Sequence, residues 1–152
     1  MSVPALPEPI WWNAKRPDPA ALNQISAQSI QTALGIELTN AGDDWLAGRM
    51  PVDARTHQPW GRLHGGASVV LAETLATLGA VHTLDQSQFM AVGMEINANH
   101  IRPAKDGLVF ATGKAESIGR TTQIWSIRIE DEAGKLVCIS RITMAVISTE
   151  RA

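Results

Sequence analysis

The longest nearly continuous run of hydrophobic residues lies at the centre of the chain. Residues 65–81 are glycine, aliphatic residues, serine and threonine, with Glu73 as the one ionisable side chain. A run of this length predicts a long helix that is apolar on nearly every side and must be enclosed by other parts of the protein. Because an ionised carboxylate in the middle of a bilayer is costly, we expect a buried helix, and no membrane partner.

Alternating apolar and polar positions follow this run and continue almost to the end of the chain. Together with a similar pattern before the run, they predict six strands, at residues 35–39, 45–51, 89–101, 108–118, 121–130 and 135–147. Clusters of turn-forming residues separate the last four strands, which favours an antiparallel arrangement. A polar loop is predicted over residues 53–63.

The first part of the chain is predicted from its prolines. An aspartate followed by proline is typical of a helix start, and apolar spacing extends the predicted helix over Pro19–Thr32. Residues 1–18 are rich in proline and contain the neighbouring pair Trp11 and Trp12. They predict an irregular lead that docks by its indole rings, followed by a single domain over residues 19–150.

The order of the predicted elements defines the fold class. A short helix and two strands come first, then the long helix, then four strands. Only the sheet contains enough residues to enclose the long helix, and a neighbouring subunit could complete the cover. We therefore predict an α+β fold in which an antiparallel sheet wraps around one long central helix.

Composition and charge exclude several other classes. The chain has 152 residues, 45% of them hydrophobic and 18% charged, as in one compact domain. A formal net charge of -2 gives no positive field, so we expect no nucleic-acid partner. The single cysteine, Cys138, and the lack of a basic and then apolar leader indicate the cytoplasm. The four histidines lack zinc-site spacing, so we expect no metal.

The residues with the most chemical information stand at the start of the long helix and along it. Gly65 and Gly66 lie at the predicted start of the helix, where N–H groups are unpaired and the helix dipole is positive. Glycine has no Cβ, so a ligand carbonyl can approach these N–H groups closely, as in an oxyanion site. Glu73 and Thr77 are four residues apart, so both side chains lie on one face of the helix. A carboxylate in apolar surroundings suits a general base or a nucleophile.

Each of these residues also has a purely structural explanation. A glutamate in an apolar helix can pair with a buried arginine or face a subunit boundary, and two glycines can allow close packing. His64 can cap the helix, Gln58 can bond to the loop backbone, and Thr77 can bond back to its own helix. The combination is more specific than any one member, and it favours a catalytic site.

The segment Gln58–Thr77, with the pattern Q-x-x-G-x-x-H-G-G followed by Glu73 and Thr77, resembles the hotdog-fold acyl-CoA thioesterases of the 4-hydroxybenzoyl-CoA thioesterase type. Segments at 50–56, 93–100 and 141–145 are similar to the bacterial branch that hydrolyses 1,4-dihydroxy-2-naphthoyl-CoA and related thioesters. The resemblance covers about residues 20–148. It implies the hotdog fold, in which the long helix is surrounded by the sheet.

The resemblance implies a role for each residue of the motif. Glu73 corresponds to the catalytic carboxylate, either as a nucleophile that forms an acyl-enzyme anhydride or as a base for an attacking water. The Gly65 N–H corresponds to the group that polarises the thioester carbonyl. Gln58 and His64 help to place the substrate and the helix, and Thr77 holds the water or the acyl end. No cofactor is implied, because the CoA thioester is itself the substrate.

The coenzyme portion is expected along the strands that follow the helix. In the resembling enzymes the corresponding positions are Val92, Asn99, His100, Arg102, Ser117, Gly119, Arg120, Thr121 and Thr122. Exposed N–H groups in a turn and a guanidinium both bind phosphate, which suits Gly119 and Arg120. A plain hairpin turn is the structural alternative for this segment.

The resemblance further implies that the site lies between two subunits. Residues 58–65 of one chain would face Glu73 and Thr77 of the other, in a homo-oligomer expected to be a dimer of dimers. We therefore expect an acyl-CoA thioesterase that releases the free acid and CoA. The alternative is a non-catalytic acyl-CoA-binding hotdog module, although such a module has no reason to bury a carboxylate beside a thioester.

Overall fold

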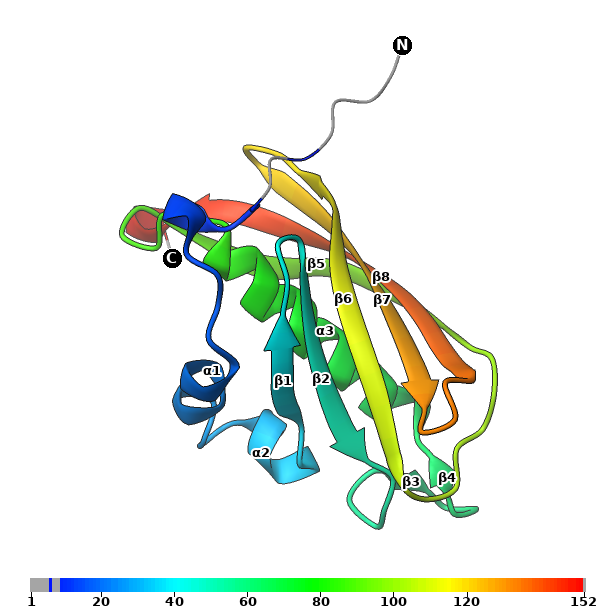
Figure 1. The fold of residues 1–152 in the computed structure, drawn as a ribbon. Coiled ribbons are helices and arrows are strands. Elements are labelled where there is room, and N and C mark those ends of the chain that lie inside the picture. Colours follow the sequence, from blue (N-terminus) through cyan, green and yellow to red (C-terminus); the bar gives the residue numbers. More distant parts are fainter. Residues whose placement is uncertain (1–5, 7–8, 152) are drawn as a thin grey trace.

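A computed structural model describes residue 6 and residues 9–151 of the chain. Its main feature is one long helix, α3 (Gly65–His82), which lies along one side of a six-stranded antiparallel sheet (Figure 1). Two short helices, α1 (Pro19–Ile25) and α2 (Ile30–Leu34), lie near the first strand of that sheet (Figure 1). The predicted α+β architecture is therefore confirmed.

The sheet has the strand order β1-β2-β6-β7-β8-β5, with β1 and β5 at its edges. Its strands are β1 (Glu37–Ala41), β2 (Trp45–Pro51), β5 (Phe89–His100), β6 (Leu108–Ile118), β7 (Thr122–Asp131) and β8 (Leu136–Ser148). All six predicted strands are present, with boundaries that differ by two residues at most. The largest shift concerns β1, because Gly35 has a φ of 70° and ends α2, so the strand begins later than predicted.

The single helix predicted over Pro19–Thr32 is wrong, because the structure has two helices there. The Ser29 Oγ accepts a hydrogen bond from the Gln31 N–H at 3.2 Å and donates one to the Ser26 carbonyl at 2.7 Å. Serine side chains that bond to nearby backbone in this way compete with helical hydrogen bonds. The chain therefore ends α1 at Ile25 and starts again at Ile30.

The predicted loop over residues 53–63 contains a small hairpin of its own. Strands β3 (His57–Gln58) and β4 (Arg62–Leu63) pair with each other and not with the main sheet. Strands of two residues carry no alternation that a sequence could show. The turn before them is held by Asp53, whose pKa is lowered to about 2 by hydrogen bonds from the side chain and backbone of Arg55.

The core lies between α3 and the concave side of the sheet. Leu71, Leu75 and Ala76 of the helix are fully buried. A Cβ added at Gly79 would come within 2.7 Å of the Trp125 ring on β7, so only glycine allows the helix this close to the ring. The Trp125 indole N–H donates to the Gln123 amide oxygen at 3.0 Å, and the Gln123 NH₂ group donates to the hydroxyl of Thr83, the C-cap of α3, at 2.8 Å. These buried hydrogen bonds connect the sheet to the helix.

One face of α3 stays outside this core. Glu73 is exposed, and Val70, Thr74, Thr77 and Leu78 are only partly buried. The sheet of the single chain therefore covers the helix on one side and leaves this face uncovered. No helix among the described residues has the length and hydropathy that crossing a bilayer requires.

The described part of the N-terminal lead docks by one of its two indole rings. Trp11 is 3% exposed, and its ring stacks on Trp125 with a centroid distance of 6.4 Å. Its indole N–H donates to the Gly42 carbonyl at 2.7 Å. Trp12 begins a short 3₁₀ turn, Trp12–Ala14, and remains 48% exposed, so it does not dock as predicted.

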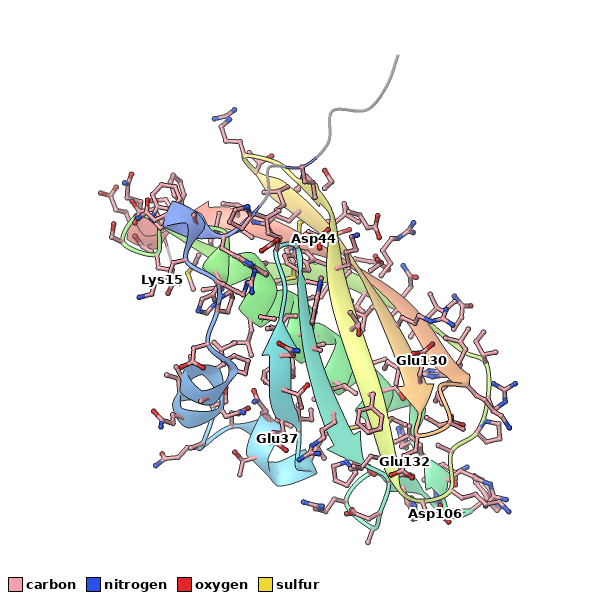
Figure 2. All side chains as sticks on the ribbon, viewed as in Figure 1. Lys15, Glu37, Asp44, Asp106, Glu130 and Glu132 are labelled. Atoms are coloured by element: carbon pink, nitrogen blue, oxygen red, sulfur yellow. The ribbon has the colours of Figure 1, made fainter. Side chains whose placement is uncertain are left out.

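Ion pairs line the outer side of the sheet. Glu37 of β1 pairs with Arg49 of β2 at 2.7 Å, and Arg128 pairs with Glu130 within β7 at 2.7 Å. In Figure 2 the carboxylates of Glu37 and Glu130 extend from opposite parts of the sheet. This side of the protein therefore has the character of a solvated surface.

Candidate active site

The start of α3 presents an unpaired backbone donor. His64 caps the helix, because its Nδ1 accepts a hydrogen bond from the Gly66 N–H at 2.8 Å. The Ala67 N–H donates to the His64 carbonyl at 3.0 Å. The Gly65 N–H has no acceptor among the described residues. A free N–H at the positive end of an 18-residue helix can polarise a carbonyl whose oxygen accepts a hydrogen bond from it.

A hollow of about 330 Å³ lies next to this helix start, and we call it the α3-start pocket. Its lining includes Gln58, Arg62, Gly65, His100 and Arg102. A Cβ added at Gly65 would come within 2.7 Å of the His100 Nε2, so glycine lets the His100 ring lie directly on the helix start. The Gln58 Oε1 accepts a hydrogen bond from the Trp60 N–H, which orients its amide group.

Glu73 and Thr77 lie in a second hollow, of about 390 Å³, which we call the α2–α3 groove. It is lined by Ser29, Ile30, Gln31, Val70, Glu73, Thr74, Thr77 and Leu78. A Cβ added at Gly93 of β5 would come within 2.8 Å of the Glu73 Oε1, so the carboxylate lies close to the backbone of this strand. The apolar enclosure expected for Glu73 is absent from the single chain, where the residue is exposed.

The two halves of the predicted catalytic set are therefore separate within one chain. Gln58 and Gly65 line the α3-start pocket, whereas Glu73 and Thr77 line the α2–α3 groove. Gly65 and Glu73 are eight residues apart on the helix, which corresponds to about 12 Å along its axis. One substrate carbonyl cannot contact both residues of the same chain.

The positions predicted to bind the coenzyme also form two groups. His100, the last residue of β5, and Arg102, two residues later, line the α3-start pocket, and Asn99 precedes them on the strand. The segment 117–122 lies at the other end of the sheet, where Gly119 and Arg120 share a hollow with Phe89, the first residue of β5. Eleven residues of extended strand, about 36 Å, separate Phe89 from His100. The single chain does not bring the two groups together.

The residues predicted to bind the coenzyme differ in whether their hydrogen-bond donors are already paired and in their exposure. The Gly119 N–H donates to the Thr122 carbonyl at 2.9 Å, so the expectation of a free N–H at this residue is wrong. The Arg102 Nη1 donates to the Leu136 carbonyl at 2.9 Å, which fixes its guanidinium at the edge of the pocket. Arg120 and Val92 are exposed. Ser117, Thr121 and Thr122 are exposed as well.

Strand β5 is a long edge strand, interrupted by one register shift between Gly93 and Glu95. It is 12 residues long, and in the described part of the chain it pairs only with β8. Val92 and Met94 on it are 37% and 64% exposed. A long exposed edge with apolar side chains is a template for pairing with another strand.

Among the described residues, no three His, Cys, Asp or Glu side chains cluster as metal ligands.

The sequence did not single out three residues that line the α2–α3 groove. Ser29, Ile30 and Gln31 come from α2 and its cap, more than 40 positions before Glu73. The cap of a short helix is a local signal, but nothing local indicates that this helix borders a hollow on α3. Arg62 in the α3-start pocket was missed for a similar reason, because the β3–β4 hairpin that places it was not predicted.

A six-stranded antiparallel sheet packed on one long helix, with an N–H at the helix start that no described residue accepts and a carboxylate two turns later, is the arrangement of a hotdog-fold domain of the thioester-hydrolase class. Residues 61–138 match the thioesterase superfamily. The chain belongs to this superfamily.

Solved structures and a curated relative agree with this assignment. The thioesterase from Pseudomonas aeruginosa, solved as a mutant, has a TM-score of 0.89 and 46% identity, and the match covers 91% of this chain and 99% of that chain. A thioesterase from Haemophilus influenzae has a TM-score of 0.86 and 44% identity, covering 91% and 95%. The 1,4-dihydroxy-2-naphthoyl-CoA hydrolase of Escherichia coli is 45% identical over 127 residues, covering 84% and 93%.

Proposed function

We propose that this protein is an acyl-CoA thioesterase that hydrolyses an aryl- or acyl-CoA to the free acid and CoA at sites shared between two subunits. The observation that carries the proposal is the division of the site, with a free N–H in one hollow and a carboxylate in another on the same helix. The name of the Escherichia coli relative supports an aryl-CoA as one substrate.

A second copy of the chain can unite the two halves through β5. Gly65 lies against His100 and Glu73 lies against Gly93, so both halves are positioned along this strand. Antiparallel pairing of β5 with its copy can place His100 opposite the partner subunit's Gly93. The two-fold axis then passes close to Ile96 and Asn97. Each Gly65 N–H then faces the partner subunit's Glu73, and the dimer contains two equivalent sites.

The reaction follows from this arrangement. The Gly65 N–H and the helix dipole stabilise negative charge that develops on the thioester oxygen. The Glu73 carboxylate either attacks the carbonyl carbon, expelling the CoA thiolate and leaving an anhydride that water cleaves, or removes a proton from a water that attacks directly. Both routes consume one water and yield the acid and CoA. Thr77 holds the water or the acyl end, and the chemistry requires no further cofactor.

The remaining residues of the motif orient the substrate and the helix. The Gln58 amide group, with its oxygen held by the Trp60 N–H, directs its NH₂ group as a donor to the substrate. His64 holds the first turn of α3 through its cap, so it positions Gly65 and does not react itself. Their proposed role is to fix the geometry in which the carbonyl meets the N–H.

The same dimer brings the two coenzyme groups together. With β5 aligned as above, Phe89 of one subunit lies close to residues 102–104 of the other. Arg120, which shares a hollow with Phe89, then approaches the partner subunit's Arg102. Two guanidinium groups suit the phosphates of CoA. Association of two such dimers into a tetramer stays a prediction.

Replacement of the carboxylate tests the proposed function. Glu73→Gln keeps the size of the side chain but removes the base or nucleophile, so hydrolysis should fall by at least about a hundredfold. Free-thiol release should be measured from benzoyl-, hydroxybenzoyl-, hydroxynaphthoyl- and medium-chain acyl-CoAs. Glu132→Gln, an identical change at an exposed turn residue, serves as the control and should keep full activity. If the wild type binds CoA and hydrolyses none of these thioesters, it is a binding module.

A further inference from the structure

A third hollow, of about 330 Å³, lies where β5 begins, and we call it the β5-start hollow. Its lining includes Trp12, Asp85, Phe89 and Arg120. In Figure 1 the blue N-terminal segment lies beside the start of β5 and the end of β8 at this place. Trp12 is outside residues 61–138, the segment that matches the superfamily, so the N-terminal lead adds a wall to this hollow that the family match does not include.

Trp12 is held in this hollow by the residues around it. The neighbouring Trp11 is 3% exposed and anchors the segment in the core. The Ala14 N–H donates to the Trp11 carbonyl at 2.9 Å and closes a turn in which Asn13 and Ala14 have positive φ values of 53° and 55°. Residues with a Cβ rarely adopt this conformation, and they retain it only where the surrounding structure imposes it. Trp12 therefore has a fixed position, although it is 48% exposed.

Two charged residues of opposite sign line the hollow, Arg120 and Asp85. Hydrogen bonds from the hydroxyl and the backbone N–H of Ser87 lower the pKa of Asp85, so its carboxylate is ionised at neutral pH. A phosphate group is attracted by Arg120 and repelled by Asp85, whereas an uncharged aromatic ring is tolerated beside either residue. The hollow therefore suits a ligand that has an anionic group at one end and a flat, uncharged ring at the other.

The hollow is within reach of the proposed reaction site. Glu73 lies against Gly93, and Phe89 at the hollow is four residues earlier on β5, about 13 Å along the strand. In the proposed dimer the thioester carbonyl lies between Glu73 and the partner subunit's Gly65. The extended pantetheine arm of CoA spans such a distance, so the nucleotide end of the coenzyme can reach the hollow. That end consists of anionic phosphates and an uncharged, flat adenine ring.

We propose that the indole ring of Trp12 stacks on the adenine ring of the CoA thioester, next to phosphates that Arg120 binds. A base and an aromatic side chain attract each other through their flat faces, without a need for hydrogen bonds. The N-terminal lead then makes the protein favour thioesters of CoA over thioesters of pantetheine alone. This inference rests on the proposed thioesterase function and adds the residue that recognises the base. Trp12 determines specificity and takes no part in bond cleavage.

The test compares a substrate that has the nucleotide with one that lacks it. Values of kcat and KM should be measured for the acyl-CoA that the wild type hydrolyses fastest and for the pantetheine thioester of the same acid. Trp12→Leu removes the aromatic ring, and Trp12→Phe keeps a flat one. Phe110→Leu is the matched control, because Phe110 is 40% exposed on β6 and does not line the hollow. Isothermal titration with CoA measures the affinity of each protein independently of turnover.

Trp12→Leu should raise KM for the acyl-CoA by about 5-fold or more and leave kcat nearly unchanged, because it removes a stack that lies far from the reacting carbonyl. It should not affect the pantetheine thioester. Trp12→Phe should recover most of the loss, and Phe110→Leu should behave as the wild type.

The inference is wrong, and the proposed function stands, if Trp12→Leu changes the KM of neither substrate or of both equally. If the wild type hydrolyses no thioester, the proposed function is wrong and the affinity for CoA decides the inference. A weaker affinity in Trp12→Leu than in Phe110→Leu supports the adenine stack, and equal affinities overturn it.

Discussion

Gly65 combines two properties that a single substitution normally changes together. It lacks a Cβ, which allows the His100 ring to lie against it, and its N–H is unpaired among the described residues. Two substitutions separate these properties. Gly65→Ala adds the Cβ and keeps the N–H, whereas Gly65→Pro adds a ring and removes the N–H. Proline is favoured at the first position of a helix, and the extended backbone of His64 is compatible with it.

We expect Gly65→Pro to be slower than Gly65→Ala by about 100- to 1,000-fold in kcat, because only the proline variant lacks the donor to the developing oxyanion. The difference between the two variants is the informative quantity, since both displace the His100 ring. Steady-state thiol release measures it, and circular dichroism checks that α3 is retained. Equal rates for the two variants would remove Gly65 from the proposed mechanism.

For single residues, the position on the helix could be predicted from the sequence, whereas the burial of the side chain could not. Residue types and spacing were sufficient to place Gly65 at a helix start and Glu73 with Thr77 on one face. The environment of Glu73 was not predictable, because the helix pattern indicates burial on every side, whereas the described residues leave this side of α3 exposed. Gln31 could not be found, since its surroundings depend on a side-chain bond to Asn23, which in turn bonds to the backbone of Leu38.

Helix α2 shows how a short element can determine the shape of a site. Five residues cannot form a stable helix alone, so α2 depends on its caps and on packing. Ser29 supplies the N-terminal cap through its Oγ, and Gly35 supplies the left-handed residue at the other end. This helix contributes the wall of the α2–α3 groove that lies opposite α3.

Removal of the cap should therefore destabilise the protein and loosen the groove. We expect Ser29→Ala to lower the free energy of unfolding by about 1 kcal/mol, which urea denaturation measures. Ser29→Thr retains the accepting oxygen and should recover most of the loss. A Ser29→Ala protein as stable as the wild type would show that packing alone holds α2.

At the scale of elements, long periodic segments were predicted well and short ones were not. The strands after residue 88 agree with the sequence pattern because each has ten or more residues and turn-forming clusters separate them. The β3–β4 hairpin and the break between α1 and α2 depend on a few side-chain to backbone bonds. Those bonds leave no periodic trace in the sequence.

At the scale of the whole molecule, Gly65 and Glu73 of one chain line different hollows. The proposed site therefore combines Gly65 of one chain with Glu73 of another. This can be tested by mixing variants. Glu73→Gln and Gly65→Pro should each be nearly inactive as homodimers. In a mixed dimer, one site combines an intact Gly65 with an intact Glu73 from the other chain.

Equal amounts of the two variants, exchanged by co-expression, should therefore regain about a quarter of the wild-type activity, since about half of the dimers are mixed and half of their sites are intact. Activity that stays at the level of the separate variants would show that each site is built from one chain. Mixing wild-type protein with either variant provides the calibration for subunit exchange.

The contact between Gly79 and Trp125 limits how this protein can vary in length. One extra residue between Gly65 and Glu73 would turn everything after it by about 100° around the helix axis. Glu73 would leave the face it shares with the α2–α3 groove, and a residue with a Cβ would meet the Trp125 ring in place of Gly79. An insertion or deletion in α3 before Gly79 should therefore cost both the groove and the helix packing, whereas a turn between two strands has no such restriction.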